Sequence, residues 1–176
     1  MIDTERLLLR PWIEADREPF LAMTADPEVM SWLGGVPTPD AANQRFERFA
    51  SGFDERGYTR WAIERTADGA FLGYCGLAPV HESLPVTGIE AGWGLARAAW
   101  GFGYAAEAAR AAVLDGFDRL KFEEIIAFTA DTNRRSQAVM ARAGLTRDPS
   151  RDFDHPNLPE GDPLRRHWVY AATRPA

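Results

Sequence analysis

The chain has 176 residues, of which 45% are hydrophobic and 26% charged, a composition typical of one globular domain over residues 1–176. Its net charge of −6 argues against a sequence-independent nucleic-acid binder, which needs a basic face. The single cysteine, Cys75, excludes an internal disulfide and a multi-cysteine zinc site. We expect a cytoplasmic protein with no membrane partner, because no apolar run has the roughly 18–20 residues of a membrane span and the N-terminus is charged.

The first half of the chain predicts a strand, three helices and an antiparallel meander. Pro11 ends the first apolar run, Asp16 and Thr38 can cap helices, and Gly57 closes the last of these helices. The expected helices cover 16–23, 28–33 and 38–56, and the expected strands cover 4–12, 58–64, 70–78 and 87–95.

In the second half of the chain, the spacing of the apolar residues changes and predicts alternating helices and strands. Apolar residues at helical spacing predict a helix over 104–120, and the run at 123–129 is typical of a central strand buried on both faces. A capped helix is expected to end at Ala143, and a last strand covers 164–173 after a mostly loop segment, 145–163. This order predicts an α+β (mixed α/β) domain with a parallel strand pair around the 104–120 helix.

Two close glycines, Gly101 and Gly103, lie where the strand that ends at Leu95 leads into that helix. Glycines let backbone N–H groups approach an anion, and a helix N-terminus adds unpaired N–H groups and a partial positive charge. The turn therefore suits a phosphate or pyrophosphate, although a tight strand-to-helix turn explains the same glycines.

The same residues also fit the dinucleotide fingerprint G-x-G-x-x-A, with an acidic residue, Glu123, at 20 residues after Gly103. The preceding strand contains Glu90, Gly92 and Gly94 in place of a continuous apolar run, and no further βαβ units follow. A nucleotide-dependent oxidoreductase is therefore the less favoured alternative.

Four segments, in order, make the chain resemble the GNAT superfamily of acetyl-CoA-dependent N-acyltransferases, and most of all its ribosomal-protein N-terminal alanine and serine acetyltransferase branch. They are residues 4–11, 26–30, 90–108 and the N-x-x-S helix with its following glycine, 133–145. The resemblance covers almost the whole chain. It implies a central mixed, mostly antiparallel sheet flanked by helices and splayed between the 86–95 and 123–129 strands.

The resemblance implies transfer of an acetyl group from acetyl-CoA, as co-substrate, to a primary amine by direct attack in a ternary complex. The amine belongs to a protein N-terminus or a small molecule, and the acidic balance of the chain suits a cationic acceptor. A non-catalytic acyl-CoA-binding or sensing module on the same fold is the alternative. A homodimer is compatible with the sequence.

Glu90 is the candidate base, because an amine with a pKa near about 8 must lose a proton before it attacks. A salt-bridged strand carboxylate is the alternative. By resemblance, Ser136 protonates the departing thiolate and contacts the cofactor, and Asn133 binds the pantetheine arm. A helix cap at Asn133 and a first-turn residue at Ser136 are the alternatives. Tyr170 in the last strand is a reserve candidate for the acid, and a structural tyrosine in the core or at the sheet edge is the favoured alternative.

The resemblance also implies that residues 101–105 bind the acetyl-CoA pyrophosphate through their backbone N–H groups. These residues are Gly101, Phe102, Gly103, Tyr104 and Ala105. The backbone N–H near Leu95 would polarise the thioester carbonyl. Arg97 is a further candidate cofactor-binding residue. It lies one residue before Ala98, which replaces the Gln or Arg common in relatives and leaves the loop without side-chain support at that position. Phe102 also replaces a residue that is often basic.

The acceptor amine is expected to approach between segments 31–40, 79–87 and 153–163, with Trp32 in the pocket wall. Cys75 is expected to be a small core residue. The arginines at 134, 135 and 142 either meet the cofactor's phosphates or form a solvated helix face. The three histidines, at 81, 155 and 167, have no ligand spacing, and we expect no metal.

Overall fold

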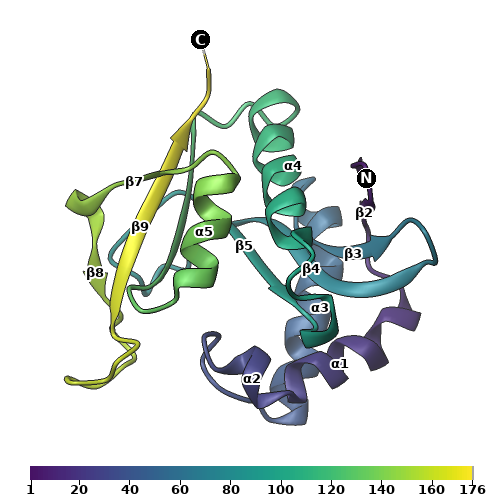
Figure 1. Ribbon diagram of the computed structural model, residues 1–176, viewed down its shortest axis with the longest axis horizontal. Helices are drawn as coiled ribbons and strands as arrows, with labels where there is room; N and C mark the ends of the chain where they lie inside the picture. Colours follow the sequence, from purple (N-terminus) through teal and green to yellow (C-terminus); the bar gives the residue numbers. More distant parts are fainter. Residues whose placement is uncertain (176) are drawn as a thin grey trace.

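The computed structural model describes residues 1–175, which form one nine-stranded sheet with helices on both faces (Figure 1). The strands are β1 (Ile2–Asp3), β2 (Leu7–Arg10), β3 (Arg60–Arg65), β4 (Ala70–Pro79), β5 (Ile89–Leu95), β6 (Glu124–Ala130), β7 (Thr146–Arg147), β8 (Phe153–Asp154) and β9 (Arg166–Thr173). The helices are α1 (Arg17–Ala25), α2 (Pro27–Met30), α3 (Pro39–Arg56), α4 (Tyr104–Asp118) and α5 (Arg134–Arg142). The predicted mixed α/β fold class is confirmed.

The sheet has the order β1-β2-β3-β4-β5-β6-β9-β7, and β8 also pairs with β9. All pairs are antiparallel except β5 with β6. These two strands pair at one position only, Glu90 with Ile126, whereas the β4–β5 ladder runs from Gly73–Leu95 to Pro79–Ile89. The sheet therefore opens beyond Glu90, at the strand pair where the family resemblance implies a splay.

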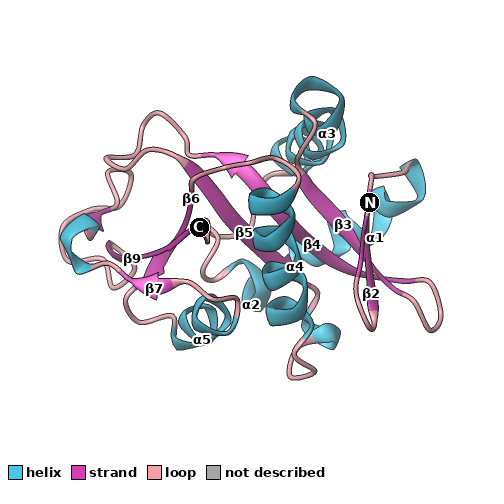
Figure 2. Ribbon diagram, turned by 90° about the horizontal axis from the view of Figure 1, so that it is seen from above, coloured by secondary structure: helices cyan, strands magenta, loops and turns pink. Residues whose placement is uncertain are grey.

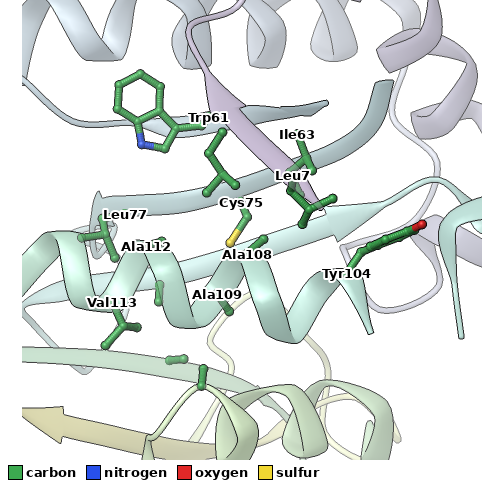
Figure 3. Close-up of a cluster of buried hydrophobic side chains, with 14 of the residues drawn as sticks. Leu7, Trp61, Ile63, Cys75, Leu77, Tyr104, Ala108, Ala109, Ala112 and Val113 are labelled. Atoms are coloured by element: carbon green, nitrogen blue, oxygen red, sulfur yellow. The ribbon is translucent and has the colours of Figure 1, made fainter. Parts of the chain in front are cut away.

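Helix α4 covers one face of the sheet and packs closely on it because its inward positions are small. Ala108, Ala109 and Ala112 are almost fully buried beside Cys75 and Leu77 of β4 (Figure 3). Helix α5 packs beside α4 on this face. The alanine-rich sequence thus sets a short distance between α4 and the strands that border the gap.

Helices α1 and α3 cover the opposite face, as Figure 2 shows. Trp12 contacts Phe20 of α1 and Phe46 of α3 edge-to-face, each with ring centroids 5.3 Å apart. Phe49 of α3 lies 5.0 Å from the ring of Tyr74 in β4. This aromatic cluster fixes α3 above the strands that carry Glu90 and its neighbours.

Several boundaries differ from the predictions. The segment 145–163 is not only loop, because β7 and β8 each pair with β9. The expected strand at 4–12 is shortened to β2, which pairs with the preceding β1, and the helix at 28–33 ends at Met30. Elements of two to four residues carry too little periodicity to be read locally. Within residues 1–175, no helix is both long and apolar enough to span a membrane.

Candidate active site

A cavity of about 1130 Å³ lies at the gap between β5 and β6. Its wall includes the separated ends of both strands, residues 91–95 and 128–130. Residues 103–106 of α4 and its N-cap line it from one face of the sheet, and Arg45 of α3 lines it from the other. The cavity is therefore bounded by residues from both faces of the sheet.

On the α4 face, the glycine loop leaves helix N–H groups free. Gly101 and Gly103 have φ values of 86° and 83°, in the left-handed region that favours glycine. Gly103 is the N-cap and supplies no side chain, and the N–H groups of Tyr104 and Ala105 donate to no protein atom within residues 1–175. These groups line the cavity, so the loop has the chemistry of an anion site.

The support for this loop comes from the N-terminal segment, which the sequence analysis missed. Arg6 Nη1 donates to the carbonyl oxygen of Phe102 at 3.0 Å, and Arg6 Nε donates to Glu107 Oε2 at 2.7 Å. Thr4 Oγ1 donates to Glu107 Oε1 at 2.6 Å. Burial acts to raise the pKa of Glu107, but the hydrogen bonds from Thr4 and Arg6 hold that pKa below its ordinary value. Arg6 thus supports the loop where Ala98 offers no side chain.

The structure brings most of the predicted cofactor residues together but leaves two outside the cavity. The predicted site residues in its wall are Glu90, Leu95, Gly101, Gly103, Tyr104, Ala105, Asn133 and Ser136. Arg97 is ion-paired with Asp26 at 3.2 Å and with Glu28 at 3.0 Å. Phe102 is 58% exposed and stacks on the Tyr104 ring. The roles proposed for these residues stay predictions.

At the start of α5, Asn133 is the helix cap and Ser136 carries a free hydroxyl. Asn133 Oδ1 accepts from the Ser136 N–H at 3.2 Å, and its Nδ2 donates to Thr129 Oγ1 at 2.9 Å. The Ser136 Oγ makes no hydrogen bond within residues 1–175 and lines the cavity. Tyr170, the reserve acid, is not part of the cavity wall and lies beneath the Arg147 guanidinium.

On the α3 face, Glu90 is held by an arginine. Arg60 Nη2 donates to Glu90 Oε2 at 2.5 Å, and the two side chains are 19% and 17% exposed. The guanidinium lies over Gly92, where a Cβ would be 2.6 Å from Arg60 Cζ. The Tyr74 ring covers Gly94 in the same way, at 2.8 Å. Glu90, Gly92 and Gly94 alternate along β5 and therefore lie on one face of the sheet. The two glycines leave room for the Arg60 and Tyr74 side chains, which cross β5 on that face.

The three histidines, which the sequence leaves unconnected, all line this cavity. The ring centroids of His155 and His167 are 5.1 Å apart. His167 Nδ1 is 3.2 Å from the carbonyl oxygen of Arg165, so in the neutral ring Nδ1 carries the proton and Nε2 is an acceptor. Burial lowers the pKa of both imidazoles. Among the described residues, no group of three or more His, Cys, Asp or Glu side chains is arranged to hold a metal ion.

Cys75 is a core residue beneath α4 (Figure 3). It is fully buried, and this burial raises the pKa of its thiol to about 12. The thiol is therefore protonated at neutral pH and unsuited to attack a thioester.

Comparisons with known proteins agree with this geometry. The family model of the acetyltransferase (GNAT) domain matches residues 6–146. The Bacillus subtilis protein YkkB is 32% identical over 151 residues, which cover 81% of this chain and 83% of YkkB. The FsC-acetyl coenzyme A-N(2)-transacetylase of Aspergillus fumigatus is 35% identical over 153 residues, which cover 82% of this chain and 64% of that enzyme.

The structure of an acetyltransferase from Agrobacterium tumefaciens superposes with a TM-score of 0.79 at 29% identity, covering 98% of this chain and 94% of that one. Two more distant structures share the fold and contain coenzyme A: a Vibrio cholerae spermidine N-acetyltransferase (TM-score 0.76, 14% identity, 97% of each chain) and the ribosomal L7/L12 α-N-protein acetyltransferase RimL (TM-score 0.75, 15% identity, 97% of this chain and 96% of that one). The family match covers most of the chain, and the cavity lies at the β5–β6 gap beside the N-terminus of α4. The chain belongs to the GNAT acetyltransferase family and is an acetyl-CoA-dependent enzyme that acetylates an amine.

Proposed function

We propose that the acetyl group passes directly from acetyl-CoA to a primary amine while both are bound in the cavity at the β5–β6 gap. The observation that carries this proposal is the position of the cavity, which is lined from both faces of the sheet. A cysteine-linked intermediate finds no support, because the chain has one cysteine and Cys75 is buried with a raised thiol pKa.

On the α4 face, the free N–H groups at Tyr104 and Ala105 would bind the pyrophosphate, and Arg135 and Arg142 also line the cavity. The bound acetyl-CoA supplies an acetyl group activated as a thioester. Arg6 would hold the loop in this conformation through the Phe102 carbonyl.

On the α3 face, Glu90 would take a proton from the amine, directly or through water. Its Oε2 is bound by Arg60, while no hydrogen bond joins Oε1 to residues 1–175. The neutral amine nitrogen then bonds to the acetyl carbon and the carbon–sulfur bond breaks. The Ser136 hydroxyl gives its proton to the departing thiolate and regains one from the acetylated nitrogen, directly or through water. His167 is a second candidate acceptor of the amine proton, because its Nε2 is unprotonated in the neutral ring.

The test is a broad amine screen that follows release of free coenzyme A. Glu90→Gln should lower kcat and flatten its pH profile, whereas Glu82→Gln, at an exposed carboxylate outside the cavity wall, should leave both unchanged. If the pH profile of kcat is unaltered in Glu90→Gln but flattened in His167→Gln, the role of base is assigned to His167. Binding of acetyl-CoA without turnover of any amine would favour the non-catalytic sensing module.

The pyrophosphate assignment has its own test. Gly103→Val should raise the KM for acetyl-CoA sharply, because valine resists a φ of 83° and the loop must rearrange. Unchanged acetyl-CoA affinity would refute this assignment, and tighter binding of NADH than of acetyl-CoA would restore the oxidoreductase alternative.

We also propose that the chain belongs near the ribosomal-protein N-terminal acetyltransferase branch, on the strength of its four sequence motifs. RimL, at 15% identity, supports the fold alone. The screen should therefore include peptides with N-terminal alanine and serine beside small amines. A homodimer is proposed as the assembly, and sedimentation equilibrium tests it.

A further inference from the structure

Arg45 is an arginine without an acidic partner in the wall of the cavity. It lies on the inward side of α3, three residues after buried Ala42 and four before Phe49. The side chain is half-buried, and no salt bridge or hydrogen bond joins it to another side chain within residues 1–175. Burial raises the pKa of the Tyr74 phenol, and the positive charges of Arg60 and Arg45 oppose that rise. Arg45 lines the cavity from the α3 face, in the same wall as Glu90.

The charges of the described residues in the cavity wall are mostly positive. The arginines, histidines and carboxylates among them are Arg45, Arg60, Arg135, Arg142, His81, His155, His167 and Glu90. Glu90 is the one carboxylate among them, and Arg60 already pairs with it. No acidic side chain of this wall is left to neutralise Arg45.

The position of Arg45 distinguishes it from the other two unpaired arginines of the wall. Arg135 and Arg142 belong to α5, which packs beside α4 on the face where the phosphates of acetyl-CoA would bind. Arg45 belongs to α3 on the opposite face (Figure 2). An anion that pairs with Arg45 therefore has to come from the acceptor side.

We propose that the acceptor is an amine that also carries a carboxylate, and that Arg45 binds this carboxylate while the amine faces Glu90. This inference rests on the proposed function, because it takes the α3 face as the acceptor side. A guanidinium matches the planar geometry of a carboxylate and forms charge-assisted hydrogen bonds with it. A polyamine would instead bring a second positive charge beside Arg45, with the lone carboxylate of the wall already paired.

The test compares acceptors in matched pairs: ω-amino acids and α-amino acids against the alkylamines and arylalkylamines of the same skeleton, with spermidine as a polycation. The measurement is the ratio of kcat/KM for the two members of each pair, so the intrinsic reactivity of each amine cancels between enzyme variants. Arg45→Gln removes the charge, Arg45→Lys keeps it, and Arg48→Gln is the matched control on the exposed side of the same helix.

We expect Arg45→Gln to lower the carboxylate-to-amine ratio at least about tenfold, equivalent to about 1.4 kcal/mol, and Arg45→Lys to restore part of it. Arg48→Gln should leave the ratio unchanged. An equal loss for both members of every pair, or a preference for spermidine that Arg45→Gln does not alter, would overturn the proposal. An acidic N-terminal peptide that outperforms all free amino acids, and depends on Arg45, would assign the carboxylate to a peptide.

Calorimetry in the presence of coenzyme A separates this inference from the proposed function. If Arg45→Gln weakens binding of the carboxylate-bearing amines but no acetyl transfer occurs, the carboxylate site is supported and the proposed transfer is refuted. If acetyl transfer to amines occurs but Arg45→Gln does not change binding of the carboxylate-bearing amines, the proposed transfer is supported and the carboxylate site is refuted.

Discussion

Gly92→Ala tests whether β5 carries a glycine to make room for the Arg60 guanidinium. The added Cβ would lie 2.6 Å from Arg60 Cζ and 2.8 Å from its Nη2, whereas ordinary contacts fall at 3.4–4 Å. The guanidinium must therefore shift by roughly 1 Å. The shift moves Nη2 away from Glu90 Oε2, which it contacts at 2.5 Å.

The cost follows from the exposure of this ion pair. Exposed pairs contribute up to about 1 kcal/mol, and removing one partner of a fully buried pair costs about 3–5 kcal/mol. Arg60 and Glu90 are 19% and 17% exposed, so we expect Gly92→Ala to lower the free energy of unfolding by about 1–3 kcal/mol. For a domain of this size, that lowers Tm by roughly 2–12 °C. Turnover should fall as well, because Glu90 loses the contact that positions it.

A double-mutant cycle with Arg60→Ala provides the assay, with urea and thermal unfolding measured for all four proteins. Without the guanidinium the Cβ has space, so Gly92→Ala should then cost less than about 0.5 kcal/mol, because alanine is otherwise no worse than glycine in a strand. An equal cost in both backgrounds would show that Arg60 is not the obstacle and would refute this explanation of Gly92.

Two further predictions concern the cofactor loop and the histidines. Arg6→Ala should raise the KM for acetyl-CoA severalfold, because it removes the side-chain donor of the Phe102 carbonyl and of Glu107 Oε2. Arg110→Ala, at an exposed position of α4, should leave the KM unchanged. Equal KM values for the two variants would exclude Arg6 as the support. Burial lowers the folded-state pKa of His167, so the unfolded chain takes up its proton first and stability should fall as the pH drops below about 6.5. His167→Gln should reduce this loss, measured by urea unfolding between pH 7.5 and 5.5; an identical pH dependence in the variant would contradict the burial effect.

The sequence predicts an element well where its determinants are local. The helix expected at 38–56 is observed as Pro39–Arg56, because Thr38 accepts a capping hydrogen bond and Gly57 adopts a φ of 75° immediately after the last turn. The strands β7 and β8 escape prediction because they have two residues each and exist through pairing with β9. Their formation depends on a strand that lies well beyond them in the chain.

The same distinction applies to the site. The glycine loop and the start of α4 are adjacent in sequence, so their combination can be predicted from the residues at 101–105. The Arg60–Glu90 and Arg6–Glu107 contacts join residues 30 and 101 positions apart, and nothing local indicates either partner. The three histidines meet for the same reason, since the sheet order brings the segments that carry them to one cavity.

The net charge of the chain is a poor guide to its acceptor. The sequence has 26 acidic and 20 basic residues, which suits a cationic ligand if the charge is averaged over the molecule. Many of the acidic residues neutralise arginines away from the cavity, as Glu14 and Glu47 do with Arg17. Exposed charges farther away than about 8–10 Å are screened at physiological salt. The few groups in the cavity wall therefore set the local potential, and there Arg45 outweighs the acidic surface of the protein.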